Sequence, residues 1–82
     1  MILVDLYVPA LDKTYNFSLN ENIKVGSIIL EVKEMIEQKE RINFFGDVKR
    51  LSLFDREKEM KLPYENTLKE CYEKNGSKLI LI

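Results

Sequence analysis

The chain has 82 residues, 45% of them hydrophobic and 33% charged, with one cysteine and neither histidine nor tryptophan. This length fits a single small domain spanning residues 1–82 with one core. Thirteen Lys and Arg against fourteen Asp and Glu give a formal charge of −1, without the positive excess typical of nucleic-acid binding. The lack of histidine excludes an imidazole base and the usual zinc clusters.

The location of the protein is predicted from its cysteine content and its apolar runs. The lone Cys71 cannot form an internal disulfide, which favours a reducing compartment. The apolar start, Met1–Val4, is interrupted by Asp5 and has no basic residue before it, unlike a signal peptide. No window approaches the roughly 18 apolar residues of a membrane-spanning helix. We therefore expect a cytoplasmic protein without direct membrane insertion.

Two alternating segments at the N-terminus predict a β-hairpin. Ile2–Val8 has apolar residues at every second position, and Pro9 ends the strand because proline cannot donate a main-chain hydrogen bond. Thr14–Leu19 alternates again, with its two aromatic residues and Leu19 on one face. A short turn between two such runs predicts antiparallel pairing.

The hydrophobic period then changes to that of an amphipathic helix. Its apolar stripe is Val25, Ile28, Ile29, Val32, Met35 and Ile36. Asn22 is the expected N-cap, because its side-chain oxygen can accept from first-turn amides, and the helix is expected to end near Glu40 or Arg41. Gly26 lowers helix propensity by about 1 kcal/mol relative to alanine, which indicates either close packing or a later start of the helix.

The middle of the chain predicts a loop and a second hairpin. Residues 41–47 form the loop, in which one of Phe44 and Phe45 is expected to enter the core. Val48–Phe54 reads as a third strand, with Leu51 and Leu53 facing inward. The segment Asp55–Lys61 is charged with alternating sign, which is typical of a solvated hairpin tip. Met60 and Leu62 predict a short fourth strand before Pro63.

The last third of the chain predicts a short helix, a turn and a final strand. Thr67–Tyr72 suggests one helical turn, anchored by Leu68 and by Cys71 or Tyr72. Asn75-Gly76 is a strong turn signal and leads into Lys78–Ile82. A continuously apolar final strand is expected at the centre of a mixed sheet, parallel to the first strand. The predicted class is α+β: a mixed sheet of four or five strands on one long helix, which is the β-grasp architecture.

The order of these segments resembles that of ubiquitin-like proteins over essentially the whole chain. The segments that carry the likeness are 12–17, 49–53 and 67–68, followed by Asn75-Gly76 and the closing aliphatic strand. Among such proteins the chain most resembles the bacterial YukD/EsaB family of type VII (ESX-like, WXG100) secretion systems. That likeness rests on chain size, on Ile23-Lys24 before the helix and on the Asn-Gly turn into the last strand.

The resemblance implies a non-enzymatic module that binds other proteins. For this family it implies a cytoplasmic accessory component whose partner is the membrane-embedded secretion ATPase or another part of the machinery. Ubiquitin and sulfur-carrier proteins end in a flexible Gly-Gly tail, whereas this chain ends at Ile82 and Gly76 belongs to a turn. We therefore expect no conjugation. The alternatives are a carrier or modifier activated at its C-terminus, and a scaffold or regulatory domain of another pathway.

Candidate sites for chemistry are few, and we expect no catalytic, cofactor-binding or metal-binding residues. Cys71 lies between Glu70 and Glu73, whose charges raise a thiol pKa, so we expect a small buried residue rather than a nucleophile. The carboxylate pairs Glu31/Glu34 and Glu37/Glu40 are expected to be solvated on the outer face of the helix. No cofactor is implied.

A protein-docking patch is the more informative candidate. If Leu79 and Leu81 face the helix, alternation places Ile80 and Ile82 on the open face of the sheet. The predicted patch consists of Leu11, Ser52, Phe54, Ile80 and Ile82. A second outward group, Leu3 and Tyr7, lies on the first strand. Contiguous apolar patches on small proteins are often interaction sites.

Overall fold

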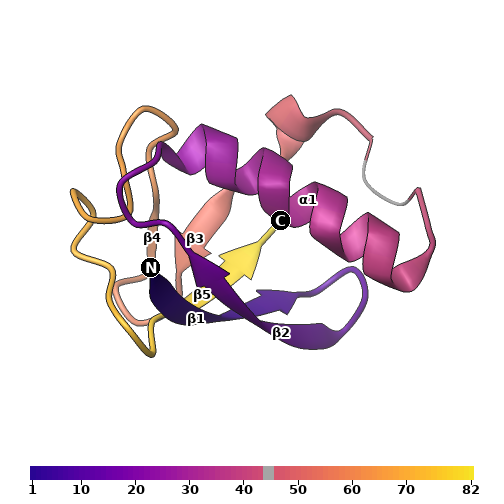
Figure 1. Ribbon diagram of the computed structural model, residues 1–82, viewed down its shortest axis with the longest axis horizontal. Coiled ribbons are helices and arrows are strands. Elements are labelled where there is room, and N and C mark those ends of the chain that lie inside the picture. The colour runs from indigo at the N-terminus through magenta and orange to yellow at the C-terminus, as the bar shows by residue number, and fades with distance from the viewer. Residues whose placement is uncertain (44–45) are drawn as a thin grey trace.

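The computed structural model describes residues 1–43 and 46–82, in which one long helix crosses a five-stranded sheet (Figure 1). In chain order the elements are β1 (Ile2–Val8), β2 (Lys13–Leu19), α1 (Val25–Glu40), the 3-10 helix η1 (Val48–Arg50), β3 (Leu53–Asp55), β4 (Met60–Lys61) and β5 (Lys78–Leu81). Phe44 and Phe45, one of which we expected in the core, lie outside the described residues.

The sheet is mixed, with the strand order β2-β1-β5-β3-β4. β1 pairs antiparallel with β2 and parallel with β5, and β5 pairs antiparallel with β3. The N-terminal hairpin and the central position of the last strand are therefore confirmed. The parallel strands β1 and β5 can be neighbours only if a long connection joins them. This connection includes α1, which lies over one face of the sheet. This is the predicted β-grasp arrangement.

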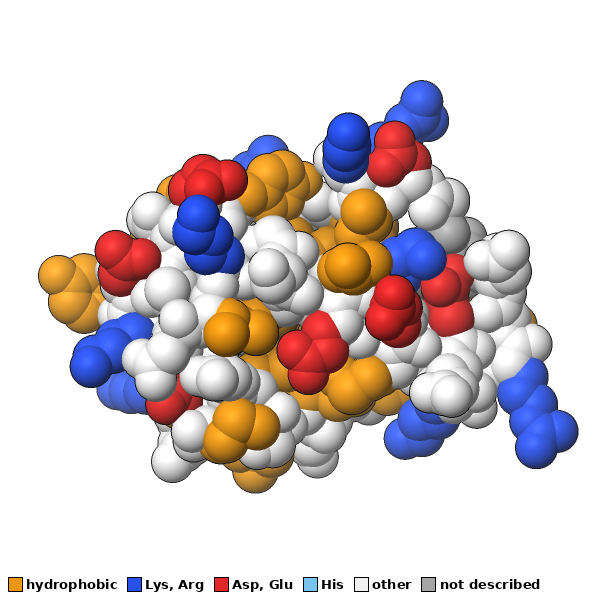
Figure 2. Space-filling model, turned by 45° about the horizontal axis from the view of Figure 1, so that its top comes forward, with side chains coloured by type: hydrophobic (Ala, Val, Ile, Leu, Met, Phe, Trp, Pro, Cys, Tyr) orange, Lys and Arg blue, Asp and Glu red, His pale blue; other side chains and the backbone are white. Residues whose placement is uncertain are grey.

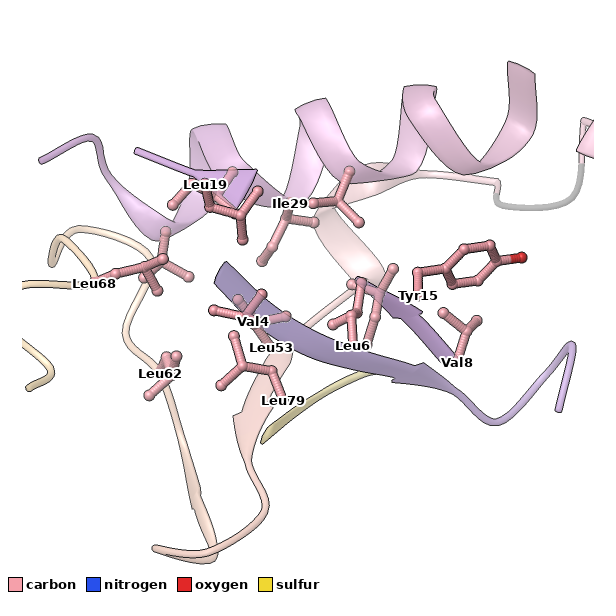
Figure 3. Packing of buried hydrophobic residues seen from close by; sticks show 14 of the residues in the cluster. Val4, Leu6, Val8, Tyr15, Leu19, Ile29, Leu53, Leu62, Leu68 and Leu79 are labelled. Atoms are coloured by element: carbon pink, nitrogen blue, oxygen red, sulfur yellow. The ribbon is translucent and has the colours of Figure 1, made fainter. Parts of the chain in front are cut away.

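The hydrophobic core lies between α1 and one face of the sheet (Figure 3). In β1 the even-numbered residues Val4, Leu6 and Val8 are fully buried, as an alternating strand requires. The predicted helical stripe is buried too, except for Met35, which packs half-buried against the cluster. Leu68 is fully buried and lies at the end of the core opposite Val8 in Figure 3.

The start of α1 differs from the prediction. Lys24, and not Asn22, is the N-cap residue, and among residues 1–43 and 46–82 no side-chain hydrogen bond caps the helix. The main-chain N–H of Val25 donates instead to the carbonyl of Asn66 at 2.7 Å. This partner is distant in sequence, so the local pattern that favoured Asn22 was misleading.

Gly26 is the second residue of the helix and lies against the main chain of Tyr64. Its N–H donates to the Tyr64 carbonyl at 3.0 Å, and a Cβ at this position would lie 3.6 Å from that oxygen. The later start of the helix is therefore wrong, and because a Cβ at this position would make only ordinary contacts, close packing does not require glycine there either.

The expected solvation of Glu37 and Glu40 is wrong. Lys33 Nζ lies 2.8 Å from Glu37, whose side chain is 13% exposed. Lys13 Nζ lies 2.5 Å from Glu40, which is 19% exposed, and the Tyr15 hydroxyl donates to the same carboxylate oxygen at 2.9 Å. Glu40 is therefore covered by two side chains of β2, whereas Glu37 is paired within α1 with Lys33, one turn earlier.

The predicted strand Val48–Phe54 is wrong in its first half. Val48–Arg50 forms η1, which Asp47 caps by accepting the main-chain N–H of Lys49 at 2.9 Å. Aspartate competes with strand pairing in this way because its carboxylate can bond to nearby main-chain amides. β3 begins only at Leu53, which is buried as predicted.

The predicted helical turn 67–72 is a series of turns and not a helix. Thr67 and Glu70 exchange two hydrogen bonds: the Thr67 N–H donates to Glu70 Oε1 at 2.8 Å, and the Glu70 N–H donates to Thr67 Oγ1 at 3.0 Å. This pattern resembles a helix N-terminus, but Tyr72 has a φ of 60°, outside the helical range. Tyr72 is 83% exposed and anchors nothing.

The predicted turn at Asn75-Gly76 is confirmed and is tied to β1. Gly76 has a φ of 88°, which glycine adopts without steric cost. Its N–H donates to the carbonyl of Leu3 at 2.8 Å, and the Leu3 N–H donates to Asn75 Oδ1 at 2.8 Å. These bonds align β5 beside β1.

Candidate functional site

One row of side chains crosses all five strands on the face of the sheet opposite α1. Tyr7 of β1 is the register partner of Ile80 in β5, and Ile80 is also the partner of Phe54 in β3. At its two ends the row continues to Thr14 in β2 and to Lys61 in β4. Register partners point to the same face of a sheet, so the three strands in the middle bring two aromatic rings and an isoleucine together.

Burial shows that this row points away from the core. Leu79 and Leu81, the neighbours of Ile80 in β5, are buried against the helix. Ile80, Tyr7 and Phe54 are half-buried. They cover one another on the side of the sheet that α1 leaves open. The predicted orientation of β5 is therefore correct, and Tyr7, which the sequence placed in a separate group with Leu3, lies directly beside Ile80.

Of the remaining residues of the predicted patch, Ser52 and Ile82 lie two positions along the chain from Phe54 and Ile80, whereas Leu11 lies in the turn between β1 and β2. Ser52 and Ile82 exchange two main-chain hydrogen bonds, of 2.5 and 3.0 Å, which extend the pairing of β3 with β5. Ser52 is half-buried, and the side chain of Ile82 is 53% exposed. Leu11, in the turn between β1 and β2, is half-buried and packs against the core cluster. Leu3 is 53% exposed on the other end of β1.

Basic side chains flank the row, and the sequence analysis missed them. Arg56 follows β3, and its N–H donates to the carbonyl of Lys78 at 2.9 Å, so the two residues lie side by side. The Arg56 guanidinium lies 5.9 Å from the ring centroid of Tyr7. In the described part of the chain, neither Arg56, Lys78 nor Lys61 takes part in an ion pair. Continuing the alternation by two residues from Phe54 would have predicted Arg56.

Acidic groups on this face lie near β1. The Tyr7 hydroxyl donates to a carboxylate oxygen of Asp12 at 2.9 Å, and this hydrogen bond is the main cause that raises the pKa of Tyr7. Asp5 is half-buried and is the register partner of Lys78. We define the open face as Asp5, Tyr7, Ser52, Phe54, Arg56, Lys61, Lys78, Ile80 and Ile82.

The opposite side of the molecule is different. In the view of Figure 2, which brings α1 forward, hydrophobic side chains form separate patches with charged side chains between them. On α1, Leu30 is an exposed hydrophobic residue, with 44% of its surface accessible. Scattered hydrophobic residues of this kind are ordinary on protein surfaces.

The hairpin tip is exposed from Arg56 to Lys61, as predicted, but Asp55 at its start is buried in an ionic cluster with Lys58 and Glu73. Asp55 is 4% exposed and Glu73 is 7% exposed. Lys58 Nζ lies 3.2 Å from Glu73 Oε2 and 3.7 Å from Asp55 Oδ2, and it donates to the carbonyl of Cys71 at 2.7 Å. Lys58 thereby joins the turn between β3 and β4 to the segment before β5.

The carboxyl groups of this cluster have opposite pKa shifts. Burial, and next the hydrogen bond with Asp55, raises the pKa of Glu73. Burial also acts to raise the pKa of Asp55, but hydrogen bonds from Glu73 and from the main-chain N–H groups of Lys58 and Glu57 outweigh it and lower the pKa. The Lys58 ammonium thus lies between two carboxyl groups whose pKa values are shifted in opposite directions, and it links the two segments that carry them.

The expected reading of Cys71 as an inert thiol agrees with its surroundings, although Cys71 is half-buried and not fully buried. Burial, followed by the charge of Glu73, raises the pKa of the Cys71 thiol, which disfavours the nucleophilic thiolate. Within residues 1–43 and 46–82, no group of three His, Cys, Asp or Glu side chains could hold a metal ion. No helix in the same ranges is both long and apolar enough to span a membrane.

Comparison with known proteins supports the fold. No family model and no curated protein matches the chain. Among solved structures, it is similar to the ubiquitin-like domain of the Arabidopsis thaliana protein At2g32350, with a TM-score of 0.73 and 17% identity over 99% of this chain and 74% of that chain. It is also similar to the N-terminal ubiquitin-like domain of the 4931431F19Rik protein, with a TM-score of 0.69 and 21% identity over 99% and 72% of the two chains.

A third similar structure is ATBAG1 in complex with HSP70, with a TM-score of 0.68 and 20% identity. The match covers 100% of this chain and 40% of that chain. Identities this low bear on the fold alone. The chain therefore has the ubiquitin-like β-grasp fold, a mixed five-stranded sheet with one helix.

Proposed function

We propose that this ubiquitin-like domain is a non-enzymatic interaction module that binds a protein partner through its open face. The observation that carries the proposal is the row of Tyr7, Ile80 and Phe54 on three adjacent strands. Aromatic and aliphatic side chains gathered in this way are typical of the centre of a protein interface. They lie on rigid strands, so binding does not require ordering of the chain.

The charges around the row support a partner with carboxylates near its own apolar anchors. Arg56, Lys61 and Lys78 flank the row without ion-pair partners in the described residues. Opposite charges at the rim of an interface speed association and orient the partner, while the apolar centre contributes most of the affinity. Binding of this kind requires no chemical reaction by the domain.

A comparison with one solved structure supports a protein as the partner. ATBAG1, a protein with a similar structure, was solved in complex with another protein, HSP70. The sequence resemblance to the YukD/EsaB family leads us to a finer proposal. In it the domain is a cytoplasmic accessory component of a bacterial type VII secretion system, and the partner is the secretion ATPase of the membrane or another part of that machinery. Binding is noncovalent, without conjugation of the chain to its partner.

The proposal is tested by affinity capture from native lysate with three baits. The wild type is compared with the double variant Ile80→Asp and Ile82→Asp, which places charges on the open face, and with Leu30→Asp, a matched control on α1. We expect the wild type and Leu30→Asp to capture the same secretion component, and the open-face variant to lose it with a nearly unchanged thermal midpoint. Equal capture by all three baits would refute docking through this face. Capture without any secretion component would refute the type VII assignment.

A further inference from the structure

β2 forms one edge of the sheet, and in the described part of the chain it has a neighbouring strand on one side only. The hydrogen bonds of β1 show which of its main-chain groups remain free. The Asp5 N–H donates to the carbonyl of Ser77, and the Leu3 carbonyl accepts from the Gly76 N–H. The odd-numbered residues of β1 therefore bond toward β5, and its even-numbered residues bond toward β2, because successive residues of a strand alternate in direction.

The register of the hairpin then identifies the free groups of β2. Even-numbered residues of β1 lie opposite odd-numbered residues of β2. The N–H and C=O groups that point out of the sheet therefore belong to Thr14, Asn16 and Ser18. Within the described ranges, no hydrogen bond from another element reaches these groups. The side chains of all three residues are exposed.

The two edge strands, β2 and β4, differ in how well they are protected from pairing with a strand of another molecule. β4 is two residues long, and Pro63 follows it closely. β2 is seven residues long and pairs with β1 without interruption from Lys13 to Leu19, so it has neither a bulge nor a proline. Its one charge, Lys13, stands at its first position. Edge strands are normally kept from pairing by proline, bulges, central charges or short length, and the middle of β2 has none of these.

We infer that β2 pairs with β2 of a second copy of this chain, antiparallel about a two-fold axis at Asn16. In this register Asn16 lies opposite Asn16 of the second copy, and Thr14 lies opposite Ser18 of the second copy. All seven residues of each strand are then paired, and all the outward main-chain groups find partners. The sheet becomes continuous across the two molecules.

The side chains of β2 are complementary to themselves in this register, which favours a second copy over an unrelated strand. On the face away from the helix, all the paired side chains are short and polar: Asn16 lies opposite Asn16, and Thr14 lies opposite Ser18. On the helix face, Tyr15 lies opposite Phe17 of the second copy, and these rings already stack within one chain with centroids 5.6 Å apart. Lys13 lies opposite Leu19 of the second copy, so the like charges do not meet. Aromatic pairs stabilise antiparallel strands, whereas like charges directly opposite destabilise them.

Complementary charges at position 16 test this pairing. Asn16→Lys and Asn16→Glu each place like charges at the two-fold axis on an exposed side chain, and Ser27→Lys on the exposed side of α1 controls for added charge. By analytical ultracentrifugation of a dilution series, we expect the wild type and Ser27→Lys to dimerise. Each variant at position 16 should raise the dissociation constant about tenfold or more. An equimolar mixture of the two should restore dimers.

Amide exchange provides a second, residue-specific readout on the wild-type chain. At concentrations where dimers form, the amides of Thr14, Asn16 and Ser18 should be protected, and dilution should release them while β1 stays protected. A wild type that remains monomeric with rapid exchange at these three amides would overturn the inference. Dimers that persist in both single variants at position 16 would overturn it as well, since another surface would then join the copies. Neither result bears on docking through the residues that define the open face, because none of them belongs to β2.

Discussion

Replacement of Glu73 by glutamine should make the protein less sensitive to rising pH. The Glu73 side chain is fully buried and lies with Asp55 around the Lys58 ammonium. Burial, reinforced by Asp55, raises its pKa in the folded state. Glutamine has nearly the same shape and can donate to Asp55 through its amide, but it does not titrate. A comparison of Glu73→Gln with the wild type thus isolates the free energy that the folded state loses when this carboxyl group ionises.

The sign and size of the effect follow from proton linkage. With a folded pKa above the unfolded value of about 4.3, Glu73 stabilises the fold fully at lower pH, where it is protonated in both states. That stabilisation is lost as the pH rises through the folded pKa. Between the two pKa values, the free energy of unfolding of the wild type should fall relative to Glu73→Gln by about 1.4 kcal/mol per pH unit. Above the folded pKa the difference should remain constant.

Urea unfolding followed by circular dichroism from about pH 4 to pH 8 measures this difference. Glu65→Gln is the matched control, because the Glu65 side chain is 84% exposed and pairs with Lys24 at the surface. The control should differ from the wild type by less than about 1 kcal/mol at every pH. A constant difference between Glu73→Gln and the wild type, or a wild type that gains relative stability as the pH rises, would refute the reasoning.

Three other predictions concern single contacts of the fold. Burial raises the pKa of Tyr15 to about 12, so an alkaline absorbance titration should show a step near pH 12 that Tyr15→Phe removes. A titration complete near pH 10 would contradict this. In thermal denaturation, Gly76→Ala should lower the free energy of unfolding by about 1–2 kcal/mol, because Gly76 has a φ of 88°. Gly26→Ala should raise it by up to about 1 kcal/mol, because the added Cβ would make ordinary contacts with Tyr64. Equal effects of the two glycine variants would be inconsistent with these backbone conformations. Tyr64→Phe removes hydroxyl hydrogen bonds to the carbonyls of Leu51 and Lys49 and should cost about 1 kcal/mol; an unchanged midpoint would show that these bonds do not stabilise the fold.

Regular patterns in the sequence predicted the elements that bury one face. Alternation in 2–8 and 14–19 and the helical stripe from Val25 were sufficient for the hairpin and α1, because burial of one side leaves a strict period. The apolar final segment was sufficient for the central strand. Short elements were not predictable in this way. Val48–Arg50 became η1 because Asp47 caps it, and Thr67 begins a cap that no helix follows.

Features that depend on distant partners were beyond the sequence alone. Alternating charges around Asp55 predicted solvation, and nothing local indicated that Lys58 would meet Glu73 from the segment before β5. The carbonyl of Asn66 likewise satisfies the start of α1 from another element. Both errors have the same physical origin, since a polar group can be buried only when a partner supplied by the fold satisfies it.

The candidate docking surface was partly predictable. Alternation in β5 placed Ile80 on the open face, and the structure agrees because Leu79 and Leu81 are buried. The neighbours of Ile80 depend on register, which alternation does not provide. The register joins Tyr7 to the row and brings Arg56 over its ring. The basic flank therefore emerges only once β1, β5 and β3 are placed side by side.

The most direct test of docking through the open face is a nuclear magnetic resonance titration of the labelled domain with its purified partner. The account predicts that signals of Tyr7, Phe54, Ile80 and Ile82 shift or broaden on binding, while those of Leu30 on α1 remain unchanged. Perturbations confined to α1, with the open-face signals unaffected, would contradict it.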